Sequence, residues 1–117
     1  MSPSPTAVHP SGLCPRYHRA VELIGRRWTG AIVRTLAARP RRFNELVCAI
    51  PGISDRLLTE RLRELEAERI VRRDVHAGSP VRVVYDLTQR GRDLQPALDE
   101  IAQWAQRWLE PPEAPEA

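Results

Sequence analysis

The stretch from Gly25 to Glu66 constrains the fold of this chain most strongly, because helical patterns alternate there with short breaks. Apolar residues at helical spacing predict helices over about 27–38, 44–50 and 54–68, separated by Pro40 and by a Pro51–Gly52 turn. Two strands, over 71–76 and 81–87, follow with Gly-Ser-Pro at the tip between them. Three helices followed by a hairpin predict a winged helix-turn-helix, in an α+β fold that is mostly α.

Two further helices are predicted on either side of this unit, over 15–24 and about 89–109, and residues 41–43 suit a very short strand. The last helix carries an apolar stripe at heptad spacing, which a C-terminal helix must bury against the rest of the chain, against a second copy, or against both. We expect a homodimer interface built from both helices. Its predicted residues are Tyr17, Val21, Leu94, Leu98, Ile101, Trp104, Ala105 and Trp108.

The length of 117 residues suits one domain. We expect a disordered Pro- and Ser-rich leader over 1–13, the winged helix-turn-helix domain with its C-terminal dimerisation helix over 14–110, and a disordered tail over 111–117. No apolar run is long enough for a transmembrane helix and no signal peptide is evident, so no membrane partner is expected. Two cysteines are too few for a disulfide framework, which favours the cytoplasm.

The positive charge is concentrated in the first four-fifths of the chain. Residues 14–92 hold 17 arginines against 9 acidic residues, whereas residues 93–117 hold 1 arginine against 6 acidic residues. Arginine is the side chain that contacts phosphate and guanine with two parallel hydrogen bonds. Double-stranded DNA is therefore the expected partner of the basic part.

The helix over 54–68 is the candidate recognition helix, with Ser54 as its expected N-cap. Leu57, Leu58, Leu62 and Leu65 fall on one arc and should face the core, which leaves a polar row pointing outward. Arg82 should lie near the end of the projecting hairpin, where a wing reaches phosphates or the minor groove. The full set of predicted DNA-binding residues is Arg27, Arg41, Arg42, Ser54, Asp55, Arg56, Thr59, Glu60, Arg63, Arg73 and Arg82.

The chain resembles the HxlR-type regulators, winged-helix transcription factors related to the MarR group. The matching motifs are Cys14-Pro15, GRRWT (25–29), RRFNEL (41–46), IPGIS (50–54), LTERLRELE (58–66), VRRDV (71–75), PVRVVYDLT (80–88) and RGRDL (90–94). The resemblance implies a bacterial regulator, expected to be a repressor, that binds an inverted repeat as a homodimer through its first and last helices. It also implies a recognition helix over 54–66 and a wing over 71–87. Arg69 stands where a helix-ending glycine is common in the family.

Cys14 is a possible sensor, because some relatives that share the N-terminal Cys-Pro use that cysteine to sense oxidants or electrophiles. A helix N-terminus favours a thiolate, although an unreactive thiol kept by descent is an equally weighted alternative. Cys48 is expected to be a small core residue. Histidine and cysteine spacing does not support a metal site, and no cofactor is expected.

No phosphate-cradling glycine loop or nucleophile elbow is present in the sequence, so an enzyme is not expected. The remaining alternative is a protein-interaction module that uses the basic face to bind an acidic partner. The effector, if there is one, is unknown from the sequence.

Overall fold

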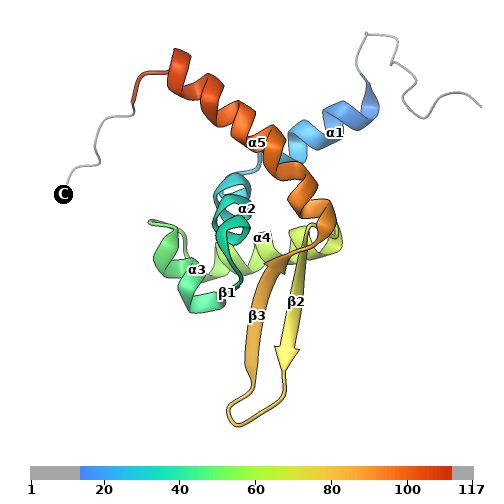
Figure 1. The fold of residues 1–117 in the computed structure, drawn as a ribbon, viewed down its shortest axis with the longest axis vertical. Helices are drawn as coiled ribbons and strands as arrows, with labels where there is room; N and C mark the ends of the chain where they lie inside the picture. Colours follow the sequence, from blue (N-terminus) through green and yellow to red (C-terminus); the bar gives the residue numbers. More distant parts are fainter. Residues whose placement is uncertain (1–13, 112–117) are drawn as a thin grey trace, which may run out of the picture.

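The structure, a computed structural model, describes residues 14–111 and confirms the winged helix-turn-helix fold. Helices α2, α3 and α4 form the centre of the molecule, while the β2–β3 hairpin projects from one end and α1 and the distal half of α5 extend from the other (Figure 1). The predicted leader, and residues 112–117 of the predicted tail, lie outside the described residues. The elements are α1 (Pro15–Ile24), α2 (Thr29–Ala38), β1 (Arg41–Arg42), α3 (Phe43–Ala49), α4 (Asp55–Ala67), β2 (Val71–His76), β3 (Arg82–Leu87) and α5 (Gln89–Trp108).

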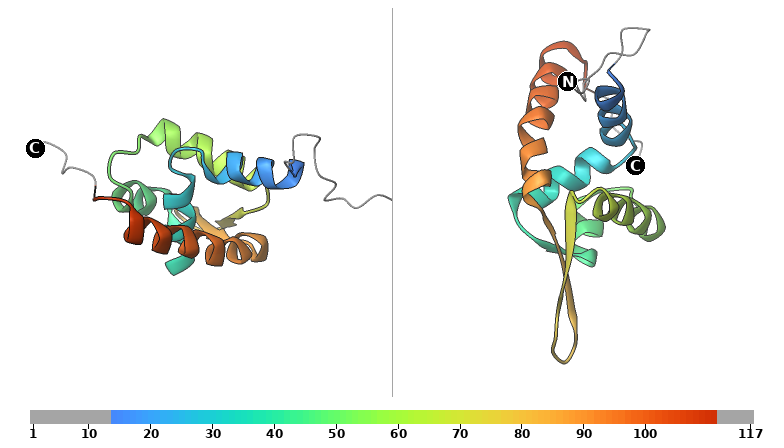
Figure 2. Two further views of the ribbon diagram at one scale, coloured as in Figure 1. Left: turned by 90° about the horizontal axis from the view of Figure 1, so that it is seen from above. Right: turned by 90° about the vertical axis from the view of Figure 1, so that its right-hand side faces the viewer.

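The three strands form an antiparallel sheet in the order β1-β3-β2. Val71 pairs with Leu87 at the base of the hairpin and His76 pairs with Arg82 at its far end. The hairpin is strongly twisted and its distal part extends well beyond the helices (Figure 2). Exposure rises accordingly along β3, from fully buried Leu87 to a 59% exposed Val81 just before the strand.

The core lies between the helices of the central unit and the base of the sheet. Leucine and isoleucine side chains at helical spacing supply it, and burying such side chains stabilises the fold by about 1.5–3 kcal/mol each. The largest fully buried side chains are Ile32 and Leu36 of α2, Leu46 of α3, Leu58, Leu62 and Leu65 of α4, and Leu87 of β3.

Two predicted helix starts are wrong by one or two residues. Helix α2 begins at Thr29 instead of 27, because Trp28 adopts a left-handed conformation (φ 78°) that interrupts helical hydrogen bonding. Helix α3 begins at Phe43 instead of 44, with Arg42 as its N-cap. The Glu45 carboxylate accepts the Arg42 N–H at 2.8 Å, which fixes the helix start one residue earlier than predicted.

Helix α4 ends as the sequence comparison with the family suggested, with a non-glycine residue in a left-handed conformation. Arg69 has φ 61°, a conformation that costs about 1–2 kcal/mol for a residue with a side chain. The following Ile70 N–H donates to the Leu65 carbonyl at 2.9 Å, so this turn satisfies the end of the helix. The turn directs the chain into β2, and hence sets the direction of the hairpin.

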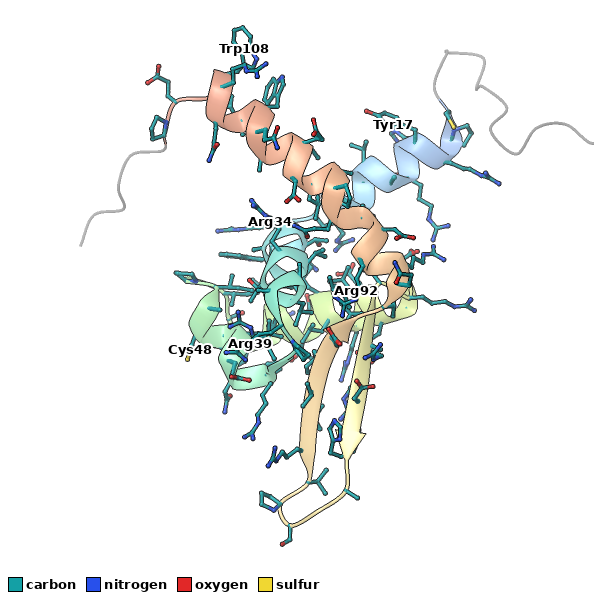
Figure 3. All side chains as sticks on the ribbon, viewed as in Figure 1. Tyr17, Arg34, Arg39, Cys48, Arg92 and Trp108 are labelled. Atoms are coloured by element: carbon teal, nitrogen blue, oxygen red, sulfur yellow. The ribbon has the colours of Figure 1, made fainter. Side chains whose placement is uncertain are left out.

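Buried Asp86 joins the hairpin to the start of α5. Its carboxylate accepts from Arg72 of β2 and from Arg92 of α5, each at 3.1 Å, and from the Leu87 N–H at 2.8 Å. Figure 3 shows Arg92 beside the base of the hairpin, where α5 begins. Because three donors hold one 6% exposed carboxylate, the wing and α5 are fixed together at this point.

The first half of the apolar stripe of α5 packs on the chain's own core, whereas the second half is exposed. Leu98 is 8% exposed and belongs to the chain's own core, with half-buried Leu94 packed against that core. The prediction that Leu98 contributes to a subunit interface is therefore wrong, because the first half of α5 lies across α2 and β3. Farther along the helix, Ile101, Trp104 and Trp108 are 51–68% exposed.

Candidate DNA-binding interface

The turn between α3 and α4 sets the orientation of the candidate recognition helix. Gly52 adopts φ 90°, which strongly favours glycine, and the Trp28 ring lies close behind it. Ser54 is the N-cap of α4, as predicted, and its hydroxyl accepts the Leu57 N–H at 3.1 Å. Buried Leu58, Leu62 and Leu65 then hold one face of α4 on the core. The opposite face is consequently turned to solvent.

This outer face of α4 carries the predicted contact residues in a regular row. Arg56 is 87% exposed in its side chain and its Nε lies 3.4 Å from a Glu60 oxygen. The Thr59 hydroxyl donates to the Asp55 carbonyl at 2.8 Å, while Arg63 projects outward. The row thus presents donors and acceptors together, as groove edges require.

Arg61 lies on α4 but serves the structure of this region. Its side chain is 12% exposed, and it donates to the Arg27 carbonyl at 2.9 Å and to a Glu64 oxygen at 2.7 Å. The Arg27 guanidinium lies 4.8 Å from the centre of the Trp28 ring. Arg61 therefore holds the loop that presents Arg27 against α4. Arg61 was not among the predicted contact residues, and this structural role was not predicted from the sequence either.

The two predicted contact residues of β1 have different surroundings. Arg41 is half-buried and pairs with Tyr85, whereas Arg42 is exposed and pairs with Val84. The Arg42 N–H, with a further contribution from Arg39, holds the pKa of Glu45 below its ordinary value. Glu45 is therefore ionised at neutral pH and anchors the strand and helix α3 together.

The two predicted arginines of the wing point to opposite faces of the hairpin. Side chains alternate along a strand, and Arg73 shares its face with Tyr85, whereas Arg82 shares the other face with His76. The twist of the hairpin turns these faces gradually from base to tip (Figure 2). Both arginines are exposed, so each side of the wing carries a cation.

The predicted contact arginines differ from the remaining arginines in their pairing. Among the seven, only Arg56 has a carboxylate partner within residues 14–111. Eight of the other eleven form such pairs in the same part of the chain. Arginines that lack an internal counter-ion leave their charge available to an external anion.

The predicted interface helices lie at the end of the molecule opposite the wing. Helix α1 contains no buried residue, and Tyr17 and Val21 on it are 66% and 43% exposed. Tyr17 and Trp108 are both at this end (Figure 3). A ten-residue helix is marginally stable in water on its own, so this exposed apolar surface calls for a covering partner.

The two cysteines are far from equivalent. Cys14 is half-buried and immediately precedes α1, where its carbonyl accepts the His18 N–H at 2.9 Å. Cys48 is exposed on the outer side of α3 (Figure 3), so its predicted core position is wrong. The reason is helical geometry: Leu46 faces the core, and two residues farther the helix has turned by about 200°.

Proteins of similar structure and sequence are transcriptional regulators. The reduced form of the transcriptional regulator YodB from Bacillus subtilis aligns with a TM-score of 0.78 at 42% identity, covering 86% of this chain and 99% of that one. The reduced redox regulator HypR aligns with a TM-score of 0.74 at 36% identity, covering 79% and 91% of the two chains. The HTH-type transcriptional regulator YvaP of Bacillus subtilis is 44% identical over 89% of this chain and 96% of its own.

The fold and these similarities define a helix-turn-helix transcriptional regulator. Residues 23–113 match the HxlR-like helix-turn-helix family, and the chain belongs to that family. None of the helices within residues 14–111 is both long and apolar enough to cross a membrane.

Proposed function

We propose that this regulator binds an inverted-repeat operator as a homodimer, acts as a cytoplasmic repressor and has no enzymatic activity. The observation that carries the proposal is a set of arginines on α4, β1 and the wing that have no carboxylate partner within residues 14–111, namely Arg41, Arg42, Arg63, Arg73 and Arg82. A protein that neutralises DNA phosphates releases counter-ions, so such free cations supply affinity for a duplex. Arg56, Thr59, Glu60 and Arg63 of α4 supply the groups that read base edges in the major groove.

The homodimer is supported by the exposed apolar surface of α1 and distal α5. Tyr17, Val21, Ile101, Trp104 and Trp108 stand on two helices that extend away from the core (Figure 1). Aromatic residues are enriched in subunit interfaces, and a two-fold dimer reads two half-sites, so their linkage increases affinity.

Binding-site selection from random duplexes tests this function. The purified chain should enrich an inverted repeat whose half-site centres lie about one helical turn, ~34 Å, apart. Arg56→Ala should enrich a degenerate site at one position of each half-site. Selection of no common sequence would contradict the proposal.

The alternative of an acidic protein partner makes a different prediction. A basic face that merely holds acidic proteins would bind polyglutamate and random duplex with similar affinity and no preference for an operator. The presence of Glu60 beside Arg56 favours DNA, because a carboxylate can accept from a cytosine amino group, whereas the carboxylates of an acidic protein offer it no donor.

We further propose that Cys14 makes this regulator responsive to electrophiles. Three structures of YodB, in its reduced, diamide-treated and quinone-bound forms, resemble this chain. Cys14 precedes a helix with no buried residues. Addition of the thiolate sulfur to a quinone ring carbon forms a C–S bond and moves the electron pair of the ring C=C bond onto a ring oxygen. Transfer of the proton from the attacked carbon, together with one proton from solvent, to the two ring oxygens then leaves a hydroquinone thioether. This bulk would lie where α1 meets the expected partner subunit, which would alter the spacing of the two recognition helices.

Single variants test the role of Cys14. Cys14→Ser should bind DNA both before and after quinone treatment. Cys48→Ser, like the wild type, should bind DNA before quinone treatment and lose binding after it. If operator affinity is unchanged when mass spectrometry shows complete alkylation of Cys14, this thiol does not control the regulator.

A further inference from the structure

The far end of the hairpin brings two basic side chains face to face. His76 is the last residue of β2 and Arg82 the first of β3, and they are the final paired residues of the ladder. Side chains opposite each other on antiparallel strands have Cβ atoms about 4.5–5.5 Å apart. The His76 and Arg82 side chains are therefore close enough to contact one small anion together.

The shape of the hairpin tip suits such an anion. A hollow of about 400 Å³ is lined by His76, Gly78, Ser79, Arg82 and Val84, among others. His76 and Arg82 are both exposed, so a ligand reaches them from solvent. Gly78 at the tip has φ 155°, a backbone conformation that favours glycine.

The charges that share this face leave the pair without a counter-ion. Strand alternation puts Arg72, Asp74, Val84 and Asp86 on the same face of the hairpin as His76, and β1 adds Arg42 beside Val84. Both acidic residues are already engaged by Arg72, Asp74 at 3.0 Å and Asp86 at 3.1 Å. Within residues 14–111, neither His76 nor Arg82 forms an ion pair.

We propose that His76 and Arg82 form a phosphate clamp at the wing tip, which holds the DNA backbone more tightly when His76 takes up a proton. This proposal rests on the proposed DNA-binding function. A phosphate oxygen between the two side chains accepts from the Arg82 guanidinium and, when His76 is protonated, from a second charged donor. DNA binding and proton uptake therefore favour each other. Histidine is the side chain whose charge changes most readily near neutral pH.

The test measures how duplex affinity depends on salt at two pH values. The full chain is titrated into a fluorescently labelled duplex from its own upstream region at about pH 6 and about pH 8, over a range of salt concentrations. Each additional phosphate contact changes the slope of log affinity against log salt by about −0.9. Wild type should therefore have a slope steeper by roughly one per wing at the lower pH, with affinity increased about three- to tenfold at moderate salt.

Three variants test whether the pH dependence of DNA binding comes from His76. His76→Gln should behave at both pH values as wild type does near pH 8, and His76→Arg should show the steep slope at both. His18→Gln, which changes an exposed histidine of α1, is the matched control and should keep the wild-type pH dependence. Because His76 is exposed at the tip, these variants should have wild-type thermal unfolding.

The outcomes separate the clamp from the proposed function. If His76→Gln keeps the full pH dependence, or if wild type has equal slopes at both pH values, the clamp is wrong while DNA binding stands. If neither wild type nor His76→Arg binds any duplex at either pH, the proposed function fails, and the clamp fails with it.

Discussion

At the scale of single residues, arginines of the candidate interface differ from the other arginines because most of them have no carboxylate partner within residues 14–111 and can pair with DNA phosphates. Arg63 is exposed on α4 without a carboxylate partner in residues 14–111, whereas Arg34 of α2 lies 3.9 Å from Asp99, away from the wing (Figure 3). Arg63→Ala should weaken duplex binding and reduce the salt slope by about one per subunit if Arg63 contacts phosphate. Arg34→Ala should change neither. Fluorescence anisotropy over a salt series measures both variants, and equal losses in the two would remove the special role of the α4 face.

Glu45 gives a second prediction at this scale, through its lowered pKa. A carboxyl whose folded pKa lies below its unfolded value stabilises the fold at neutral pH, and this stabilisation is lost as the pH falls through the folded pKa. Wild type should therefore lose more thermal stability between neutral and acidic pH than Glu45→Gln does. Thermal unfolding followed by circular dichroism at several pH values measures this difference, and parallel curves would contradict it.

Single residues also show where sequence reasoning succeeded and failed. Ser54 was predictable as a cap because its side chain bonds within its own turn, and Arg56 and Arg63 were predictable as outward because leucine spacing fixes the helix orientation. The backbone conformation of Trp28 and the exposure of Cys48 were not predictable in this way. The left-handed conformation of Trp28 depends on tertiary packing, and seven-residue α3 offers too few turns to fix which face is buried.

At the scale of elements, the junction between the wing and α5 is closely packed around Gly91. Gly91 is buried in the first turn of α5, and a Cβ there would lie 2.3 Å from the Ile70 carbonyl oxygen. Gly91→Ala should therefore lower the free energy of unfolding by about 1–3 kcal/mol. Gly30→Ala in α2, where a Cβ meets nothing within 4 Å, should be neutral or stabilising by up to about 1 kcal/mol. Urea titrations of both variants measure these changes, and equal effects would contradict the account.

The elements themselves were largely predictable, since α1 and β2 have the predicted bounds and the other helices differ by one or two residues at one or both ends. The heptad pattern of α5 correctly predicted a long amphipathic helix. It could not separate Leu98, which packs on the chain's own core, from exposed Trp104, because both lie on one continuous stripe. That division depends on how far the core extends beneath the helix, which periodicity does not encode.

At the scale of the whole molecule, the wing and the expected dimer surface lie at opposite ends (Figures 1 and 2). Trp104→Glu should therefore give a monomer that retains its fold and binds a half-site weakly, because a charge at this surface opposes burial against a partner. Gln103→Glu, also exposed on α5, is the control and should stay dimeric. Light scattering at micromolar concentration measures both, and a monomeric wild type would contradict the dimer.

Titration of the purified wild-type chain into a labelled duplex from its own upstream region tests sequence-specific DNA binding most directly. We expect saturable binding that weakens steeply with added salt and exceeds binding to a scrambled duplex of the same composition by about a thousandfold or more. Binding without salt dependence, or equal binding to the two duplexes, would contradict the proposal that the exposed arginines of α4 and the wing form a sequence-specific DNA-binding surface.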